Sequence, residues 1–495
     1  MTLAAIPTPD VDWLGLAPSL VALGAASIAL IGTVFVGRGL RRPLAATVVG
    51  LGFVGMFAAA AYVYWKTPEG RDLVGEAARR DRLAAFAQCV LAAVGLLTVF
   101  VAWSDRPKQE HAGEYFALLA ASVAGMAFMV QANDLMTLFL GLEWFSLCLY
   151  VLCAVDIDLE TSLESGLKYL IVGSFGSAVL LFGSALVFGA TEELSFAQIG
   201  AAGAGALQDD TMLVVGLAMV ITGLGFKASA APFHMWTPDV YQGSPTPVTA
   251  FMAAATKVVA LVVTLRILNV AFPAQEDLWT VAVAGIAVAS LVVGNLAALV
   301  QRNVKRLLAY SSVSHAGFML IPIAAANELG AKALLFYFVP YCAASLGAFA
   351  VVAARERELL QPVTLDTLGG MGWERPFLGV SMWVFMLSFA GLPLTGGFFG
   401  KFYAFSAAVE RDWVWLVIVG VIATAVSLYY YLAVIRSMYM RSEAELQLAP
   451  VGGAPPRDLA LQVSVAVCLV VTVGSFFVVQ PLVELAERAA RSLPL

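Results

Sequence analysis

Long runs of apolar residues recur along the whole chain, and short polar segments separate them. A helix of about 20 mostly apolar residues is long enough to cross a lipid bilayer. The pattern therefore predicts an all-α polytopic membrane protein with about fourteen transmembrane helices. The predicted spans cover residues 16–36, 44–64, 83–103, 115–131, 134–154, 164–188, 211–238, 247–271, 278–300, 303–325, 331–354, 377–408, 412–436 and 459–480.

Two of these runs, 211–238 and 377–408, are too long for plain spans and contain helix breakers. The first holds Pro232 and ends at Pro238, and the second holds the segment 391–397, which is rich in glycine and proline. Proline removes a backbone donor and clashes with the preceding turn of a helix. We therefore predict that helices 7 and 12 are discontinuous, each made of two half-helices joined by an unwound link.

The spacing of the two breaks, five spans apart, predicts an internal repeat. Residues 111–271 and 272–440 each hold five predicted spans, with the break in the fourth. Because five is odd, two consecutive copies must have opposite topology in the membrane. Inverted repeats with discontinuous helices are typical of transporters, in which the breaks mark the ion path. We expect an N-terminal three-helix segment, 1–110, before the repeats and a C-terminal helix segment, 441–495, after them.

Composition supports a membrane protein and excludes several other classes. Hydrophobic residues make up 61% of the 495 residues and charged residues 13%, whereas soluble domains carry about 25% charged residues. The five cysteines lie in apolar runs without a CxxC or Cys/His metal spacing, so we expect neither an iron–sulfur cluster nor a zinc site. The sequence also lacks a P-loop, a GxGxxG motif after a strand and a haem-type histidine pair. We therefore expect no cofactor and no metal in this chain.

The positions of lysine and arginine predict the orientation of the chain. If the N-terminus lies outside the cytoplasm, the inside loops hold most of these residues, among them Lys305 and Arg306. Most outside loops are acidic or neutral, as at Glu192 and Glu193. The positive-inside rule then favours both termini on the non-cytoplasmic side of a bacterial inner (plasma) membrane. The exception is the segment 66–82, which mixes arginine with acidic residues and is expected to be a surface amphipathic stretch.

Five ionisable residues lie well inside the predicted spans: Glu143, Lys227, Lys257, His315 and Lys401. A charge at the centre of a bilayer costs at least about 2.5–3.5 kcal/mol, and such residues mark ion and proton paths. Lysine suits a proton relay because burial readily changes its protonation equilibrium, whereas arginine stays protonated. The group therefore predicts a proton relay. The alternatives are structural ion pairs and, for the histidine, a ring held by hydrogen bonds inside the bundle.

Further residues lie near this group. Glu164 and Lys168 stand at i and i+4 with glutamate first, the favourable order for an ion pair on a helix; they belong to the relay or form a solvated pair. His234, beside the first break, is a relay member or a helix cap. Arg266 lies toward a span end and is expected to extend its side chain to the interface. Asp134, at a span start, is expected to be an N-terminal cap.

Several sequence motifs surround these ionisable residues. The most specific lies at 226–251, with Phe-Lys-Ala before the break and Thr-Pro-Asp-Val-Tyr-Gln-Gly-Ser-Pro-Thr-Pro-Val-Thr-Ala-Phe after it. The other motifs are Leu-Glu at 142–143, Ser-Gly-Leu-Lys-Tyr at 165–169, Asn-Val-Lys-Arg-Leu-Leu-Ala-Tyr-Ser-Ser-Val-Ser-His at 303–315 and Gly-Gly-Phe-Phe-Gly-Lys at 396–401. Together they resemble the motifs of the antiporter-like membrane subunits of respiratory complex I, the bacterial NADH–quinone oxidoreductase, and they cover the chain from about residue 115 to about residue 440.

The resemblance implies fourteen spans, two inverted five-helix repeats and one proton channel, which couples quinone reduction by NADH to proton transfer. It implies that Glu143 and Lys227 form the input pair, that Lys257 is the central relay and that Lys401 is the terminal lysine. NADH, FMN, iron–sulfur clusters and quinone would be bound by partner subunits, and subunits M and K would be membrane neighbours. The alternatives are a subunit of a multi-subunit Na⁺/H⁺ antiporter, a subunit of a proton-pumping membrane hydrogenase and a purely architectural membrane subunit.

Overall fold

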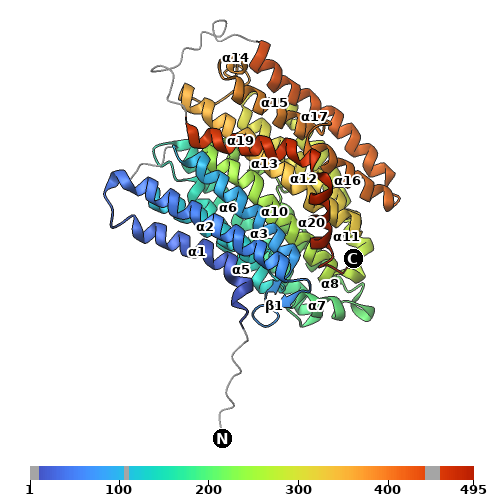
Figure 1. Ribbon diagram of the computed structural model, residues 1–495. Helices are drawn as coiled ribbons and strands as arrows, with labels where there is room; N and C mark the ends of the chain where they lie inside the picture. The colour runs from blue at the N-terminus through green and yellow to red at the C-terminus, as the bar shows by residue number, and fades with distance from the viewer. Residues whose placement is uncertain (1–10, 105–110, 441–457, 495) are drawn as a thin grey trace.

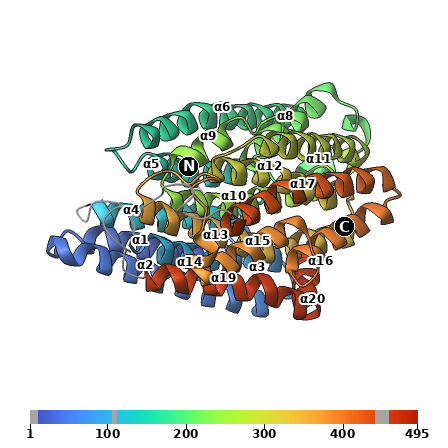
Figure 2. The same cartoon turned by 90° about the horizontal axis from the view of Figure 1, so that it is seen from above.

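The protein is described by a computed structural model, in which residues 11–104, 111–440 and 458–494 are placed. The chain forms one bundle of helices that run alongside one another (Figures 1 and 2). Parts of two loops that the sequence predicts on the cytoplasmic side, 105–110 and 441–457, lie outside the described residues.

The first elements are α1 (Trp13–Gly32), α2 (Arg38–Lys66), β1 (Arg71–Asp72), β2 (Arg79–Arg80) and α3 (Arg82–Ala102). They are followed by α4 (Ala112–Met129), α5 (Leu135–Cys153), α6 (Glu160–Thr191), α7 (Phe196–Ala202), η2 (Gly205–Leu207), α8 (Thr211–Lys227), α9 (Trp236–Gly243) and α10 (Thr246–Ala271). The second half comprises η3 (Pro273–Gln275), α11 (Glu276–Leu299), α12 (Val304–Ala324), α13 (Glu328–Leu359), α14 (Met371–Glu374), α15 (Pro376–Ala390), α16 (Gly396–Glu410), α17 (Val414–Met440), α19 (Leu459–Phe477) and α20 (Val479–Ala490).

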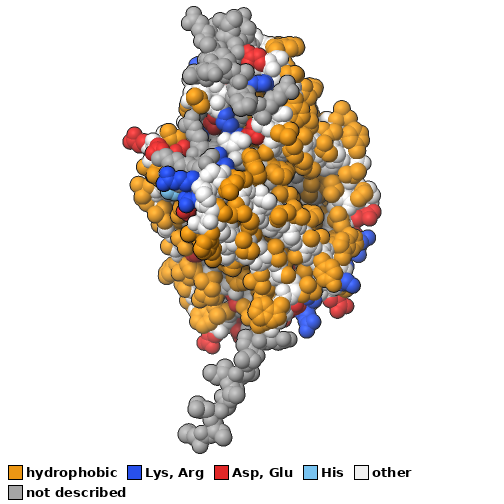
Figure 3. Space-filling model, turned by 60° about the vertical axis from the view of Figure 1, so that its left-hand side comes forward, with side chains coloured by type: hydrophobic (Ala, Val, Ile, Leu, Met, Phe, Trp, Pro, Cys, Tyr) orange, Lys and Arg blue, Asp and Glu red, His pale blue; other side chains and the backbone are white. Residues whose placement is uncertain are grey.

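The helices agree with a membrane-spanning bundle. In the described part of the chain, twelve helices are long and apolar enough to cross a membrane, and the shorter apolar helices α8 and α15 are each followed by a second half-helix, α9 or α16. The interruptions at 228–235 and 391–395 lie where the sequence predicts the breaks. Large apolar side chains cover much of the outer surface, and charged side chains gather toward the two ends of the face shown in Figure 3. This distribution fits a surface that faces lipid.

Three neighbouring helices form the inner core. The most apolar stretch of α10 is 100% buried in the bundle, and those of α12 and α13 are each 94% buried. α10 packs against α13 and α12 and also against α3, so the N-terminal helices contribute to the same core. A helix that is enclosed by protein on all sides can carry polar groups that never meet lipid. The centre of the bundle is therefore where buried ionisable residues can be accommodated.

The prediction that Arg266 extends toward the interface is wrong. Arg266 is 1% exposed, and its guanidinium forms a two-pronged ion pair with the buried carboxylate of Asp81, with N···O distances of 2.6 and 2.9 Å. Asp81 also caps α3 by accepting a hydrogen bond from the backbone of Ala84. The stretch 66–82 is therefore not simply a surface segment. Its strands β1 and β2 form a short antiparallel hairpin, whose continuation carries a carboxylate into the bundle.

Removing this carboxylate is expected to destabilise the fold strongly. Asp81→Ala leaves the Arg266 guanidinium buried without its counter-charge, and breaking a buried pair in this way costs about 3–5 kcal/mol. We expect a clearly lower midpoint of thermal unfolding for the purified protein in detergent. Glu487→Ala is the matched control, because it breaks only exposed or partly exposed pairs, with Arg491 and Lys332, each of which contributes about 1 kcal/mol at most. Equal midpoints for the two variants would contradict the prediction.

The start of α5 and the C-terminal end of the bundle add two details to the fold. Asp134 does cap its helix, since its carboxylate accepts a hydrogen bond from the backbone of Thr137 at the start of α5. The last predicted span ends at residue 480, and α20 follows it directly and packs against α13 and α3. α20 buries Val483 and Ala486 and exposes Glu484, so it is an amphipathic helix on the surface of the bundle.

Candidate functional site

Lys227 is the last residue of α8 and lies at the edge of the first break. Its side chain is 1% exposed, and its ammonium group donates a hydrogen bond to the hydroxyl of Ser146 on α5 at 2.8 Å. Ring centroids surround the ammonium group at 5.5 to 5.7 Å; they belong to Phe145, Tyr150, Tyr169 and Phe226. Aromatic faces attract cations, most strongly where water is excluded. The site can therefore hold a protonated lysine deep in the protein.

The predicted partner of Lys227, Glu143, lies beside this contact rather than in it. Glu143 and Ser146 stand three residues apart on α5 and therefore share one face of the helix. Among the described residues, Lys227 and Glu143 form no ion pair, and Oε1 of Glu143 is buried without a hydrogen-bond partner. Ser146, which the sequence reading missed, is the direct partner of the lysine. The glutamate is thus close enough to act through its charge and is not fixed by a hydrogen bond at that oxygen.

The first break brings a second lysine close to α8. Lys257 lies on α10 with 0% exposure, and its ammonium group donates to the carbonyl oxygen of Ala228 at 3.3 Å. Ala228 directly follows the end of α8, where helix carbonyls lack intrahelical partners and attract a positive charge. The break therefore supplies an acceptor at a depth where a continuous helix would use its carbonyls internally. Its conformation includes Ser229 at φ +60°, a left-handed residue that ends the helix.

His315 on α12 stands at the centre of a cluster of tyrosines. Its ring is 2% exposed, Nδ1 lies 3.0 Å from the hydroxyl of Tyr337 on α13, and Nε2 lies 3.2 Å from the hydroxyl of Tyr431 on α17. Tyr341 bonds to Ser312 at 3.1 Å and donates to the carbonyl of Ala253, which lies one helical turn before Lys257 on α10. Hydroxyl groups thus extend from the helix of Lys257 to the histidine. The sequence reading proposed the histidine and missed the tyrosines.

Lys401 lies on α16, just after the second break. It is 4% exposed, its ammonium group lies 4.0 Å from the ring centroid of Phe318 and it donates to the hydroxyl of Thr424 at 3.4 Å. Gly391 at the break has φ +75°, and a Cβ atom there would lie 2.8 Å from the side chain of Lys401. The left-handed backbone favours glycine at this position, and the close passage of the lysine side chain adds to that preference.

Lys168 and Glu164 are not part of the buried group. Their side chains are 44% and 57% exposed and pair at 2.7 Å, and Lys168 also contacts Asp239 on α9 at 3.0 Å. Asp239 in turn pairs with Arg306 on α12. These charges line a cavity of about 270 Å³. The predicted pair therefore exists, and the structure extends it to a four-charge cluster that includes two residues the sequence reading did not assign.

His234 lies within the first break, and its role as a relay member or as a helix cap stays a prediction. Its ring is half-buried, and its Nδ1 atom is buried without a hydrogen-bond partner among the described residues. The ring centroid lies 6.4 Å from that of Tyr310. For metals, the described residues contain no group of three or more His, Cys, Asp or Glu side chains placed to hold an ion.

The fold and this row of buried ionisable residues agree with a known class of membrane protein. Residues 132–427 match the family described as NADH:quinone oxidoreductase/Mrp antiporter, TM. This match covers more than half of the chain, which therefore belongs to this family of antiporter-like membrane proteins. Within the family, a relative from Herpetosiphon aurantiacus named NADH-quinone oxidoreductase subunit N 1 is 38% identical over 473 residues, with 94% of this chain and 95% of the relative covered. The chain thus belongs with the subunit N proteins.

Solved structures agree with this placement. A chain of respiratory complex I from Thermus thermophilus superposes with a TM-score of 0.77 at 31% identity, covering 94% of this chain and 99% of that one. A chain of the Mrp complex from a Dietzia species superposes with a TM-score of 0.84 at 22% identity, with 97% of each chain covered. At this lower identity the second likeness concerns the fold alone.

Proposed function

We propose that this chain is the proton-translocating, antiporter-like membrane subunit N of an NADH–quinone oxidoreductase. One observation carries the proposal: four ionisable side chains that are at most 4% exposed lie on successive packed helices of one bundle. They are Lys227 on α8, Lys257 on α10, His315 on α12 and Lys401 on α16. Burying an ionisable group in a membrane helix costs a large free energy of desolvation. Such groups are therefore rare, and they mark ion and proton paths.

In the proposed mechanism, each step transfers one proton from a protonated group to a neutral one. The charge of Glu143 favours the protonated form of Lys227, whose ammonium group is held by Ser146. When that carboxylate is neutralised or its charge is compensated by a neighbour, the lysine releases its proton toward the neutral amine of Lys257. Tyrosine hydroxyls then carry protons between the helix of Lys257 and His315, because a hydroxyl can accept one proton while it donates another. Lys401 is the terminal group.

The redox chemistry is assigned to other subunits. We propose that NADH, FMN, iron–sulfur clusters and quinone are bound by partner subunits and that this chain has no redox site of its own. Subunits M and K are the proposed membrane neighbours. In this arrangement α8–α9 and α15–α16 each cross the bacterial inner membrane as one discontinuous span, which gives fourteen spans in two inverted repeats. Both termini then lie on the non-cytoplasmic side.

Co-purification tests the assignment of the complex. A tagged form of this chain, extracted from its native membrane in mild detergent, is expected to bring with it subunits that oxidise NADH and reduce quinone. The preparation should therefore show NADH–quinone reductase activity. Co-purification with the subunits of a multi-subunit Na⁺/H⁺ antiporter or of a hydrogenase, without NADH oxidation, would contradict the assignment. An untagged strain carried through the same steps is the control for unspecific retention.

A further inference from the structure

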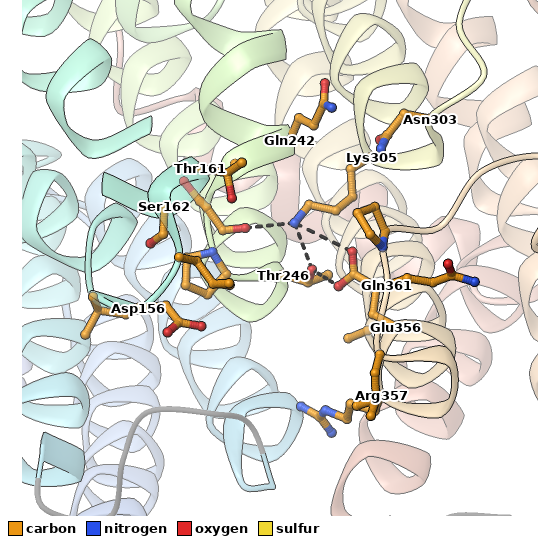
Figure 4. A pocket seen from close by; sticks show the side chains of 18 residues that line it. Asp156, Thr161, Ser162, Gln242, Thr246, Asn303, Lys305, Glu356, Arg357 and Gln361 are labelled. Atoms are coloured by element: carbon orange, nitrogen blue, oxygen red, sulfur yellow. Dashed lines mark hydrogen bonds and ion pairs between the residues drawn. The ribbon is translucent and has the colours of Figure 1, made fainter. Parts of the chain in front are cut away.

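Lys305 is a fourth buried lysine among the described residues, and the mechanism above does not use it. The sequence counts it among the positive charges at the cytoplasmic end of the span 303–325. It lies in the first turn of α12 and is 6% exposed. Its side chain points across a cavity of about 260 Å³ toward Thr246 and Glu356 (Figure 4). The start of α10 and the end of α13 enclose this position, and the sequence did not predict this burial.

A continuous chain of hydrogen bonds runs through this cluster. The ammonium group of Lys305 donates to the hydroxyl of Thr246 at 3.0 Å and to the carbonyl of Ser244 at 2.8 Å. The hydroxyl of Thr246 donates in turn to Oε2 of Glu356. The direct distance from the lysine nitrogen to Oε1 of Glu356 is longer, 3.8 Å. The hydroxyl therefore connects the base and the acid more closely than they contact each other.

The three groups differ in their access to water. Thr246 is 4% exposed, whereas the side chain of Glu356 is 23% exposed. The cavity is also lined by residues of the connecting loops, among them Asp156 and Gln361. Loops that join membrane-spanning helices lie at the ends of the bundle, outside the hydrocarbon region. Water at this end thus reaches the carboxylate first, and both Thr246 and Lys305, which is 6% exposed, lie deeper.

The cluster stands at one end of the helix that carries Lys257. Thr246 begins α10, and Lys257 follows eleven residues later on the same helix, about 16 Å away at 1.5 Å per residue. Near Lys257, the buried hydroxyl of Tyr241 lies within reach of the hydroxyls of Ser229 and Thr256. Buried polar groups of this kind commonly hold ordered water, which can connect them.

We propose that Glu356, Thr246 and Lys305 form the water-accessible inlet that loads protons onto the buried lysine path. The proposal rests on the proton-translocating function given above. In the loading step, the carboxylic acid of Glu356 gives its proton to the oxygen of Thr246, and Thr246 gives its own hydroxyl proton to the neutral amine of Lys305. The products are a carboxylate and an ammonium group, and the charge balances. The hydrogen bonds in the structure are those of this product state.

Arg355 on the neighbouring helix α13 is also a buried cation, but it forms a purely structural pair, unlike Lys305. Arg355 is 1% exposed and contacts Glu358 at 3.2 Å and Glu374 at 3.6 Å. Arginine keeps its proton and forms a permanent pair with carboxylates. At Lys305 the chain has the cation that can release its proton, and a hydroxyl lies between that cation and its acid. This combination suits the exchange of a proton rather than a permanent salt bridge.

Two matched pairs of variants in the complete complex test the inlet. Thr246→Val removes the hydroxyl and keeps the shape of the side chain, whereas Thr246→Ser keeps the hydroxyl. Lys305→Met removes the exchangeable group, and Lys305→Arg keeps a charge that cannot be released. We expect Thr246→Val, Lys305→Met and Lys305→Arg to lower the initial rate of proton pumping in inverted membrane vesicles about tenfold. Thr246→Ser should pump at close to the wild-type rate.

The outcomes distinguish proton exchange through Thr246 and Lys305 from a role of these residues in stabilising the fold. Pumping restored by Lys305→Arg, or retained in Thr246→Val, would overturn the inlet, because a fixed charge or a shape would then suffice. NADH oxidation with an acceptor that bypasses quinone reports assembly of each variant, and Lys332→Met, in a partly exposed pair with Glu487, is the control lysine. Lys227→Ala is measured in parallel. If it loses pumping while Lys305→Arg does not, the relay stands and only the inlet fails; if it retains pumping, the proposed function itself fails.

Discussion

Substitution of Lys227 by alanine in the assembled complex is expected to lower proton pumping to about a tenth of the wild-type rate or less. The ammonium group of the lysine donates a hydrogen bond to Ser146, and the residue lies at the end of α8 where the first break begins. Alanine leaves no group there that can bind and release a proton. Quinone reduction should fall with pumping, because the two are coupled in the proposed function.

The measurement compares dye-reported proton uptake and NADH–quinone reductase activity in inverted membrane vesicles. Lys66→Ala is a matched control, since that lysine is exposed at the end of α2 and its loss should leave both rates unchanged. Glu143→Gln should reduce pumping as well, and in combination with Lys227→Ala it should add little, because both changes interrupt the same step. Near-normal pumping by Lys227→Ala would remove this residue from the relay.

The helix breaks were predictable because helix-breaking residues stand inside apolar segments that otherwise favour a helix. Pro232 and Gly391 lie inside apolar runs that are long enough to continue as helices, and both residues interrupt helices for local reasons. The buried lysines were predictable for a similar reason, since a charge within an apolar run is costly wherever the run lies in the membrane. Helix periodicity and span length therefore carry most of the architecture without tertiary information.

The missed parts of the site depend on contacts between distant segments. Arg266 was misjudged because its counter-charge, Asp81, lies 185 residues away along the chain. The burial of Lys305 was not predicted, because charges near a span start are usually solvated and only the enclosing helices show otherwise. Tyr337 and Tyr431 gave no signal, since tyrosine is common in membrane helices for reasons of size and polarity. Their hydroxyls can be identified as candidate relay groups only in the folded structure, where the ring of His315 lies between them.

Lys257 gives the second large expected effect, and the structure explains why a conservative change should not rescue it. The side chain has 0% exposure and bonds to a single backbone carbonyl, that of Ala228 at 3.3 Å. Among the described residues, no carboxylate forms an ion pair with it. A charge here is stabilised only by dipoles and by the end of α8. Neutral and protonated forms can therefore exchange readily, which is the property that a central relay group needs.

Both Lys257→Met and Lys257→Arg are accordingly expected to lower proton pumping to about a tenth of the wild-type rate or less, without loss of assembly. Methionine fills the space but binds no proton, and arginine keeps a charge that cannot be released. Proton uptake and NADH oxidation in inverted vesicles measure the effect, and native gel electrophoresis reports assembly. If arginine supports pumping while methionine does not, Lys257 serves as a fixed positive charge. A fixed charge would polarise its neighbours without carrying the proton, and the path from Lys227 to His315 would then have to pass through hydroxyls and water alone.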